Sequence, residues 1–167
     1  MVLTRIELIS ALQHEVKILL HLAGKIDRAA LDYRPTPKQR STLDLLRYLS
    51  FMGPALVGVA RTGTFDGAAW NVLERSTDGQ GFDQAVAAIA AQADTYARLV
   101  NELSDADLRA DIAPWGEACS RGSFIVNFVL CGHAAYRTQL FLYLKAGGRD
   151  ELGTSNLWDG ADPPGKG

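Results

Sequence analysis

Four stretches of about twenty residues each carry apolar side chains at intervals of three and four, the spacing of a helix that buries one face. In the first stretch, Ile9, Val16 and Ala23 fall on one line along the helix. Four helices of this length predict an all-α fold, an antiparallel four-helix bundle. We expect the helices at about residues 4–26, 42–61, 82–103 and 123–146.

The segments between these helices contain residues that end or cap a helix. The stretch "YRPTPKQRS" predicts a loop, and Ser41 or Thr42 after it is a suitable N-cap for the second helix. Pro54 falls inside that helix and predicts a kink near Gly53. One helical turn is expected around residues 69–74, and "LRADIAPW" is expected to be extended. Both later connections are long, so sequential helices need not be neighbours in the bundle.

The chain is expected to divide into two parts. Residues 1–148 form the helical bundle domain, which ends at two consecutive glycines. Residues 149–167, rich in Gly, Pro and Asp, form a C-terminal tail. Leu157 and Trp158 are the tail residues that we expect to pin part of it to the bundle.

The composition argues against several classes of partner. The 167 residues carry a formal net charge of −2 and no basic run, so nucleic acid is not an expected partner. The longest apolar stretch, residues 124–144, is interrupted by polar side chains and does not predict a membrane-spanning helix. Glu7 lies where a signal peptide would be apolar. We therefore expect a cytoplasmic protein with no nucleic-acid or membrane partner.

The two cysteines, Cys119 and Cys131, do not have a metal-binding spacing. Their number allows a disulfide, but two free thiols are the expectation for a cytoplasmic protein. Cys131 and His133 lie two residues apart on a helix, so their side chains diverge by about 200° and do not form a local pair. Cys131 is interpreted as a small core or interface residue rather than a nucleophile.

The three histidines fall on two of the expected helices. His14 and His21 share a face of the first helix that lies opposite its apolar line, so a solvated face is expected there rather than a metal site. In the fourth helix, Gly132 and Tyr136 lie on the line that faces the bundle. His133 lies about 75° from that line, on the flank.

The fourth helix is apolar over most of its girth. A second apolar stripe runs beside Arg137, away from the line that faces the bundle. Such a helix is either central or covered by a partner, and we expect a homodimer. The residues of this second stripe are Val126, Leu130, Phe141 and Leu144.

Tyr48 lies among leucines in the second helix and is expected to be at least partly buried, so its hydroxyl needs a partner. Asp44 and Arg47 are three residues apart and are expected to pair on the surface, which contributes little stability. The motifs GxGxxG, GxxxxGK[ST], GxSxG and HExxH are absent from the sequence. No phosphate loop, nucleophile elbow or zinc-protease motif is therefore predicted.

Two stretches together resemble a known family. "LDYRPTPKQRSTLDLLRYLS", residues 31–50, resembles the entry into the second helix of the DinB/YfiT-like superfamily of bacterial four-helix bundles. "HAAYRTQLFLYLKAGG", residues 133–148, resembles its fourth helix, and "LGTSNLWDGADPP" resembles its closing segment. The resemblance implies a bundle with long crossover connections. It also implies one nickel or zinc ion held by three histidines, a thiol-dependent transferase, isomerase or hydrolase activity in several members, and dimers in many.

The histidine positions of the family are changed in this chain. The resemblance places the histidine of the second helix on Tyr48 and the two of the fourth helix on Gly132 and Tyr136. A shift of one residue places His133 on one position but Arg137 on the other. Glycine offers no ligand atom and neutral tyrosine is a poor one, so we predict no bound metal and no cofactor. The alternative is an unusual site that uses His133 with a carboxylate such as Glu117 or Asp44.

The leading hypothesis is a bundle protein of the DinB type that lacks the metal site and keeps a small-ligand pocket, with a binding, sensing or structural role. The expected pocket residues are Tyr48, Gly132, His133, Tyr136 and Arg137, which would suit a small anionic or aromatic ligand. The alternative is a metal- or thiol-dependent transferase or hydrolase with an atypical site, for example with Tyr136 or His133 as acid or base. A third reading is an interaction protein that binds through the fourth helix. Ordinary core tyrosines with satisfied hydroxyls would also account for the pattern.

Overall fold

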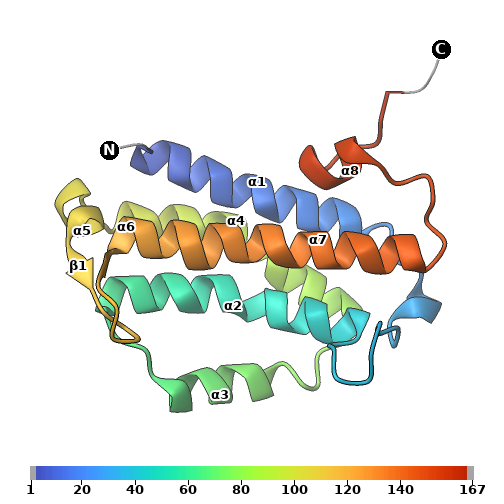
Figure 1. Ribbon diagram of the computed structural model, residues 1–167, viewed down its shortest axis with the longest axis horizontal. Coiled ribbons are helices and arrows are strands. Elements are labelled where there is room, and N and C mark those ends of the chain that lie inside the picture. Colours follow the sequence, from blue (N-terminus) through green and yellow to red (C-terminus); the bar gives the residue numbers. More distant parts are fainter. Residues whose placement is uncertain (1–2, 165–167) are drawn as a thin grey trace.

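The computed structural model describes residues 3–164, which form a helical bundle with one short strand pair (Figure 1). The four long helices match the predicted segments to within a few residues. The elements, in chain order, are α1 (Arg5–Ala23), η1 (Arg28–Ala30), α2 (Thr42–Thr62), α3 (Gly67–Ser76), α4 (Phe82–Asn101), α5 (Asp105–Arg109), β1 (Asp111–Ile112), β2 (Cys119–Ser120), α6 (Arg121–Phe124), η2 (Ile125–Leu130), α7 (Cys131–Ala146) and α8 (Thr154–Trp158).

Two capping boxes fix where α1 and α2 begin. The Thr4 hydroxyl accepts from the backbone N–H of Glu7, and the Glu7 carboxylate accepts from the backbone N–H of Thr4. Ser41 and Asp44 make the same reciprocal pair at α2, so Ser41, and not Thr42, is the N-cap. Such pairs satisfy backbone N–H groups that have no partner within a helix.

The four long helices are arranged as a ring in which sequential helices are not always neighbours. α1 packs against α4 and α7, and α2 packs against the same two helices, so α1 and α2 are diagonal. α1 and α7 run in one direction, and α2 and α4 run in the other (Figure 1). The connection through α3 carries the chain back along the bundle between the parallel helices α2 and α4. The prediction of an all-α bundle with a long crossover is confirmed. The expected antiparallel arrangement holds only in part, because α1 lies beside the parallel α7 and α2 beside the parallel α4.

The last long helix contains a wider, π-helical segment. α6, η2 and α7 follow one another without a break, and η2 is π-helical over its six residues. A π-helical turn holds more residues than an α-helical turn, so it rotates everything downstream relative to a regular helix. The core-facing positions accordingly fall at 125, 129, 133, 137, 140 and 144, a run of three steps of four before a step of three.

The segment before this helix is only partly extended. β1 and β2 form an antiparallel pair in which Asp111 lies opposite Ser120 and Ile112 opposite Cys119. Leu108 and Arg109, the first two residues of "LRADIAPW", belong instead to the short helix α5. Both cysteines are free, as expected, Cys119 half-buried and Cys131 exposed.

The C-terminal tail returns to the bundle and packs on α1 and α7 through α8. His14 Nε2 lies 2.8 Å from the carbonyl oxygen of Trp158, and His21 Nε2 lies 3.0 Å from the amide nitrogen of Asn156. The expectation of a solvated face is therefore wrong for His21, which is half-buried under the tail, because residues far apart in the sequence meet there. The division into a bundle domain and a tail stays a prediction.

One described helix has the length and composition of a membrane span. It is α2, but 61% of its most apolar stretch is buried inside the bundle. The same test is passed by core helices of soluble proteins, and α2 lies between α4 and α7. A cytoplasmic location stays a prediction.

Candidate functional site

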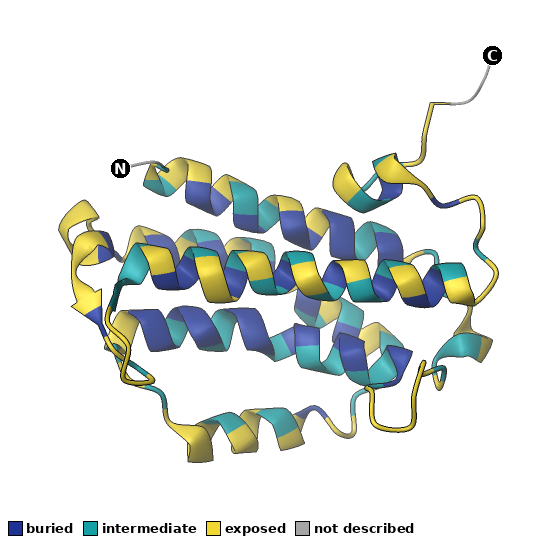
Figure 2. Ribbon diagram, viewed as in Figure 1, coloured by how far each residue is buried: buried dark blue, intermediate teal, exposed yellow. Residues whose placement is uncertain are grey.

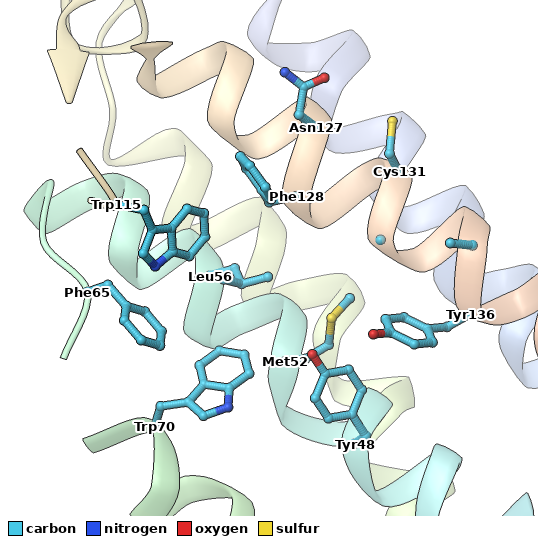
Figure 3. Close-up of a pocket in the computed structure, with 12 residues that line it drawn as sticks. Tyr48, Met52, Leu56, Phe65, Trp70, Trp115, Asn127, Phe128, Cys131 and Tyr136 are labelled. Atoms are coloured by element: carbon cyan, nitrogen blue, oxygen red, sulfur yellow. The ribbon is translucent and has the colours of Figure 1, made fainter. Parts of the chain in front are cut away.

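A cavity of about 440 Å³ lies between α2 and α7, under the crossover connection (Figure 3). Its size is within the usual range for small-molecule sites, roughly 300–1,000 Å³. Four stretches of chain contribute to it: α2, the segment through α3, the loop after β1, and the helix from η2 into α7. The lining residues are Tyr48, Met52, Leu56, Phe65, Trp70, Trp115, Asn127, Phe128, Cys131, Gly132, Ala135 and Tyr136.

Tyr48, Gly132 and Tyr136 all line this cavity. The two tyrosine rings lie edge to face, with centroids 5.1 Å apart. Figure 3 shows both hydroxyl groups directed to the same region, beside Met52. The three positions to which the family resemblance assigns histidines therefore share one site in this chain.

The phenol of Tyr48 stays protonated in this setting. Burial, and then the neighbouring Tyr136, raise the pKa of Tyr48, and the nearby cation of Arg40 only partly opposes them. The Arg40 guanidinium lies 3.9 Å from the centre of the Tyr48 ring and forms an ion pair of 3.3 Å with Glu74. Tyr48 can thus offer a neutral hydroxyl, as a hydrogen-bond donor or acceptor, but not a phenolate.

A chain of aromatic side chains continues from Tyr48 around the cavity. Trp70 follows Tyr48 at a ring-centroid distance of 6.3 Å, and Phe65 follows Trp70 at 5.7 Å. Trp115 lies 5.6 Å from Phe65, and the next ring is 4.8 Å beyond it. That ring belongs to Phe128.

Four of these rings, all but that of Tyr48, were not predicted from the sequence to belong to a site. Trp70 and Phe65 lie in the connection after α2, and Trp115 lies in the loop after β1. The signal that was available is the presence of large aromatic residues in otherwise polar connections, where they need something to pack against. Where these rings meet depends on the path of the crossover connection, which no local sequence pattern predicts.

His133 does not line this cavity, contrary to the expectation. Its side chain is 0% exposed and points into the core between α2 and α4. The π-helical segment explains the difference, because it turns the helix by about one residue, or about 100°. His133 thereby takes the inward position that a regular helix would have given to Gly132.

His133 ends a buried hydrogen-bond network. The Gln92 amide nitrogen donates to the carbonyl oxygen of Leu49 over 2.7 Å, and its oxygen accepts from the Tyr96 hydroxyl over 2.9 Å. Because Tyr96 has one proton to donate, its oxygen must accept from His133 Nε2, at 2.5 Å. This fixes the imidazole as the Nε2–H tautomer.

The imidazole is neutral at physiological pH. Burial lowers the pKa of His133 to about 4. Its Nδ1 atom has no hydrogen-bond partner among the described residues. The network therefore serves the interior of the bundle and does not supply a base to the cavity.

Arg137, also expected at the cavity, lies on the opposite side of α7. Its Nε is 3.2 Å from the Glu15 carboxylate, and its Nη1 donates to the carbonyl oxygen of Leu157 over 2.9 Å. The Trp158 ring lies 5.0 Å from the guanidinium. The same rotation of the helix that buries His133 turns Arg137 towards α1 and the tail.

The residues at the cavity do not fit a divalent metal. Its polar side chains include two phenols, the Asn127 amide and the Cys131 thiol, whereas nickel and zinc take imidazole, thiolate or carboxylate ligands. Within residues 3–164, no group of three or more His, Cys, Asp or Glu side chains could hold an ion. The carboxylates named as alternatives lie elsewhere: Asp44 pairs with Ser41 and Arg47, and Glu117 is exposed in the loop after β1.

The fold is known from a solved structure. The chain is similar to a DinB-like protein, YjoA, from Bacillus subtilis, with a TM-score of 0.68 and 14% sequence identity. The similarity covers 88% of this chain and 95% of that one. No protein-family model and no curated protein matches the sequence. The chain has a DinB-like fold, as its second and fourth helices predicted.

Proposed function

We propose that this protein binds a small molecule in the cavity between α2 and α7 without a metal ion. The observation that supports this is the lining itself, in which aromatic and aliphatic side chains surround two phenols and no charged side chain takes part. Ligand sites in proteins are typically apolar with a few polar groups that fix orientation. Tyr48 and Tyr136 are those groups here.

The lining also indicates which ligands suit the cavity. An anion would need a cation, and Arg137, which was expected to supply it, is paired with Glu15 on the far side of the helix. A planar or apolar body would pack among the rings of Trp70, Trp115 and Phe128. We therefore propose an uncharged aromatic ligand with one hydrogen-bonding group that meets the tyrosine hydroxyls.

Tryptophan fluorescence tests this proposal directly. Of the three tryptophans in the chain, Trp70 and Trp115 line the cavity, whereas Trp158 lies against Arg137. In a Trp158→Phe background, neutral 4-nitrophenol should quench the emission saturably. Tyr48→Phe or Tyr136→Phe, which each remove one hydroxyl, should weaken binding by up to about tenfold.

A matched pair of variants on α7 locates the binding. Ala135 lines the cavity, and Ala146, near the end of the same helix, is exposed outside it. Ala135→Phe should abolish quenching by filling the cavity, and Ala146→Phe should leave it unchanged. Equal quenching in all variants, or none in the parent protein, would contradict the proposal.

Two measurements bear on the alternative, a metal- or thiol-dependent enzyme. Metal analysis of the purified, untagged protein should show well under one nickel or zinc per chain, and a value near one would overturn the metal-free proposal. Cys131 is exposed at the cavity, but His133 is buried elsewhere and cannot serve it as a base. Turnover of a thiol substrate that is lost in Tyr136→Phe would favour the enzyme instead.

A further inference from the structure

The crossover helix α3 is the least buried of the longer helices. None of its ten residues is buried, whereas each of α1, α2, α4 and α7 buries at least five. Figure 1 shows α3 outside the ring of long helices, and Figure 2 shows it exposed or half-buried along its whole length. Segments with few buried contacts are those that open at the lowest cost in free energy. α3 is therefore a part of the chain that can move without disturbing the core.

A second cavity, of about 280 Å³, lies between α3 and α2, and we call it the α3 hollow. On the α3 side, Leu73 lines the hollow and is 42% exposed. On the α2 side, a Cβ atom added at Gly58 would meet nothing within 4 Å. Protein interiors are normally packed closely, so a helix that stands over a hollow gains little from the contact. The α2 wall of the hollow consists of Ala55, Gly58, Val59 and Thr62.

α3 also forms part of the wall of the ligand cavity. Trp70 from α3, and Phe65 from the connection before it, line both the α3 hollow and the cavity between α2 and α7. The centroid of the Trp70 ring lies 5.1 Å from that of Phe51 and 6.3 Å from that of Tyr48. Figure 3 shows the Trp70 ring reaching from α3 towards the cavity. A movement of α3 away from α2 would therefore open one wall of the cavity to solvent.

The last turn of α3 is its fixed end. Thr77, which follows that turn, is 4% exposed, and the carbonyl oxygen of Gln80 accepts from Arg47 Nε over 2.8 Å. The connection at the other end starts at Gly63, which ends α2 with a left-handed backbone at φ +79°. Glycine enters and leaves this conformation at no steric cost, which suits a hinge. The first turns of α3 can therefore swing while its last turn stays on α2.

One ion pair sets the angle of α3 against the bundle. Glu74 Oε1 lies 3.3 Å from Arg40 Nη2, which belongs to the loop before α2. The Arg40 guanidinium also lies 3.9 Å from the centre of the Tyr48 ring, so the pair ties α3 to a residue of the cavity. Both charged side chains are partly exposed, and such a pair contributes little stability and can break and form again. It is suited to a latch rather than to a permanent anchor.

We propose that α3 is a lid over the cavity between α2 and α7. Its first turns swing away from α2 about its last turn, and the Arg40–Glu74 ion pair latches it shut. The ligand enters and leaves past Trp70 while the lid is open. Ligand entry through the lid rests on the proposed function, whereas the motion of α3 can be measured without a ligand.

Stopped-flow fluorescence with neutral 4-nitrophenol, in the Trp158→Phe background, tests the latch. Glu74→Gln should raise the association and dissociation rate constants together by about two- to fivefold, the range for a partly exposed ion pair. The dissociation constant should stay the same, because the latch is lost from the free and the bound protein alike. Asp83→Asn is the matched control, since it removes the exposed Arg28–Asp83 ion pair of 2.7 Å, whose residues do not line the cavity. It should change neither rate constant.

A variant that fills the α3 hollow should have the opposite effect. Gly58→Leu adds an apolar side chain to the wall that faces Leu73, so α3 gains a surface to pack on and the lid should open less often. Both rate constants should fall by about threefold or more, with little change in the dissociation constant. Unchanged rate constants in either variant, or a change in the dissociation rate constant alone, would reject the lid.

Hydrogen exchange tests the motion of α3 without a ligand. The amides of residues 67–76 should exchange faster than those of α4, faster still in Glu74→Gln and more slowly in Gly58→Leu, with no change in Asp83→Asn. Exchange in α3 that is as slow as in α4, or that is the same in all variants, would overturn the proposal. If 4-nitrophenol does not bind the wild-type protein, the proposed function fails and ligand entry with it, while exchange still decides whether α3 moves.

Discussion

At the scale of single residues, packing at the centre of the bundle requires a residue without a side chain, Gly53. A Cβ atom at Gly53 would lie 1.8 Å from the Tyr96 hydroxyl and 2.7 Å from His133 Nε2. Both atoms are held in the buried network that continues to Gln92, so neither can move aside freely. The glycine is therefore required by packing, although it lies in the interior of a helix, where glycine normally costs stability.

Gly53→Ala should lower the free energy of unfolding by about 2–3 kcal/mol or more, because the added methyl group overpacks the core. Gly58→Ala is the matched control on the same helix, since a Cβ there meets nothing within 4 Å. It should raise stability by about 0.5–1 kcal/mol through helix propensity. Urea denaturation of both variants gives the comparison, and similar effects of the two would contradict this account.

His133 makes stability depend on pH in a defined direction. Burial lowers the pKa of His133 from its ordinary value of 6.5 to about 4, so the unfolded chain takes up the proton first as pH falls. The contribution of His133 is full above pH 6.5 and is lost as pH falls towards 4. The loss across this window should be about 3 kcal/mol.

The pH dependence can be isolated with His133→Leu, which removes the titrating group and keeps an apolar side chain of similar size. Other groups with a lowered pKa, such as Asp44 and His21, remain in both proteins. The difference in unfolding free energy between wild type and variant should shrink from pH 7 to pH 4. A constant difference would mean that His133 is not buried as the neutral form.

At the scale of elements, one ion pair joins α1, α7 and α8. Glu15 and Arg137 are almost fully buried and lie 3.2 Å apart, though not aligned for a hydrogen bond at these atoms. Burial raises the pKa of the Glu15 carboxyl, while Arg137 and then His14 lower it. The Nη1 atom of the guanidinium donates to the carbonyl oxygen of Leu157, so the tail contributes to the same cluster.

Arg137→Met should destabilise the protein by about 3–5 kcal/mol, because the Glu15 carboxylate is left buried without its cation. Adding Glu15→Leu should recover most of the loss, since two apolar side chains of similar volume need no partner. Unfolding free energies of the two single variants and the double variant form the cycle that measures this coupling. Additive losses would show that the two residues act independently.

The helices also show how much of the fold and of the site could be predicted from the sequence alone. Capping residues and apolar spacing predicted the four long helices, and the motifs in the second and fourth predicted the fold. Nothing in "IVNFVL" marks it as π-helical, because it reads like any apolar helix segment. Because the π-helical segment was not predicted, His133 and Arg137 were wrongly expected at the cavity. Tyr48, Gly132 and Tyr136 do lie at one cavity. The positions of the Trp70 and Trp115 rings could not be predicted, because they depend on contacts between residues far apart in the sequence.

At the scale of the whole molecule, the tail is part of the folded structure. Asn156 is 1% exposed, and its amide binds His21 and Asp162. Lys25 also pairs with Asp162, over 2.7 Å. These contacts hold the tail against the end of α1 and the turn that follows it.

Removal of residues 153–167 should leave a folded bundle that is less stable by about 1–3 kcal/mol, from hydrogen bonds lost to α8 and polar groups left without partners. Circular dichroism should still show a helical protein, because the contacts among α1, α2, α4 and α7 are kept. Urea denaturation measures the loss. An unchanged midpoint would mean that the tail only trails from the bundle.

The diagonal placement of α1 and α2 has a consequence for how the chain is made. When the ribosome has released only the first two long helices, neither can bury its apolar face on the other in the native way, since the native neighbours of both are α4 and α7. At roughly 5–20 residues per second, several seconds pass before α4 emerges and gives them a shared surface. The nascent N-terminal half is therefore the stage at which chaperone protection matters most, and ribosome-bound chains that stop before Phe82 should be markedly more sensitive to protease than those that extend past Asn101.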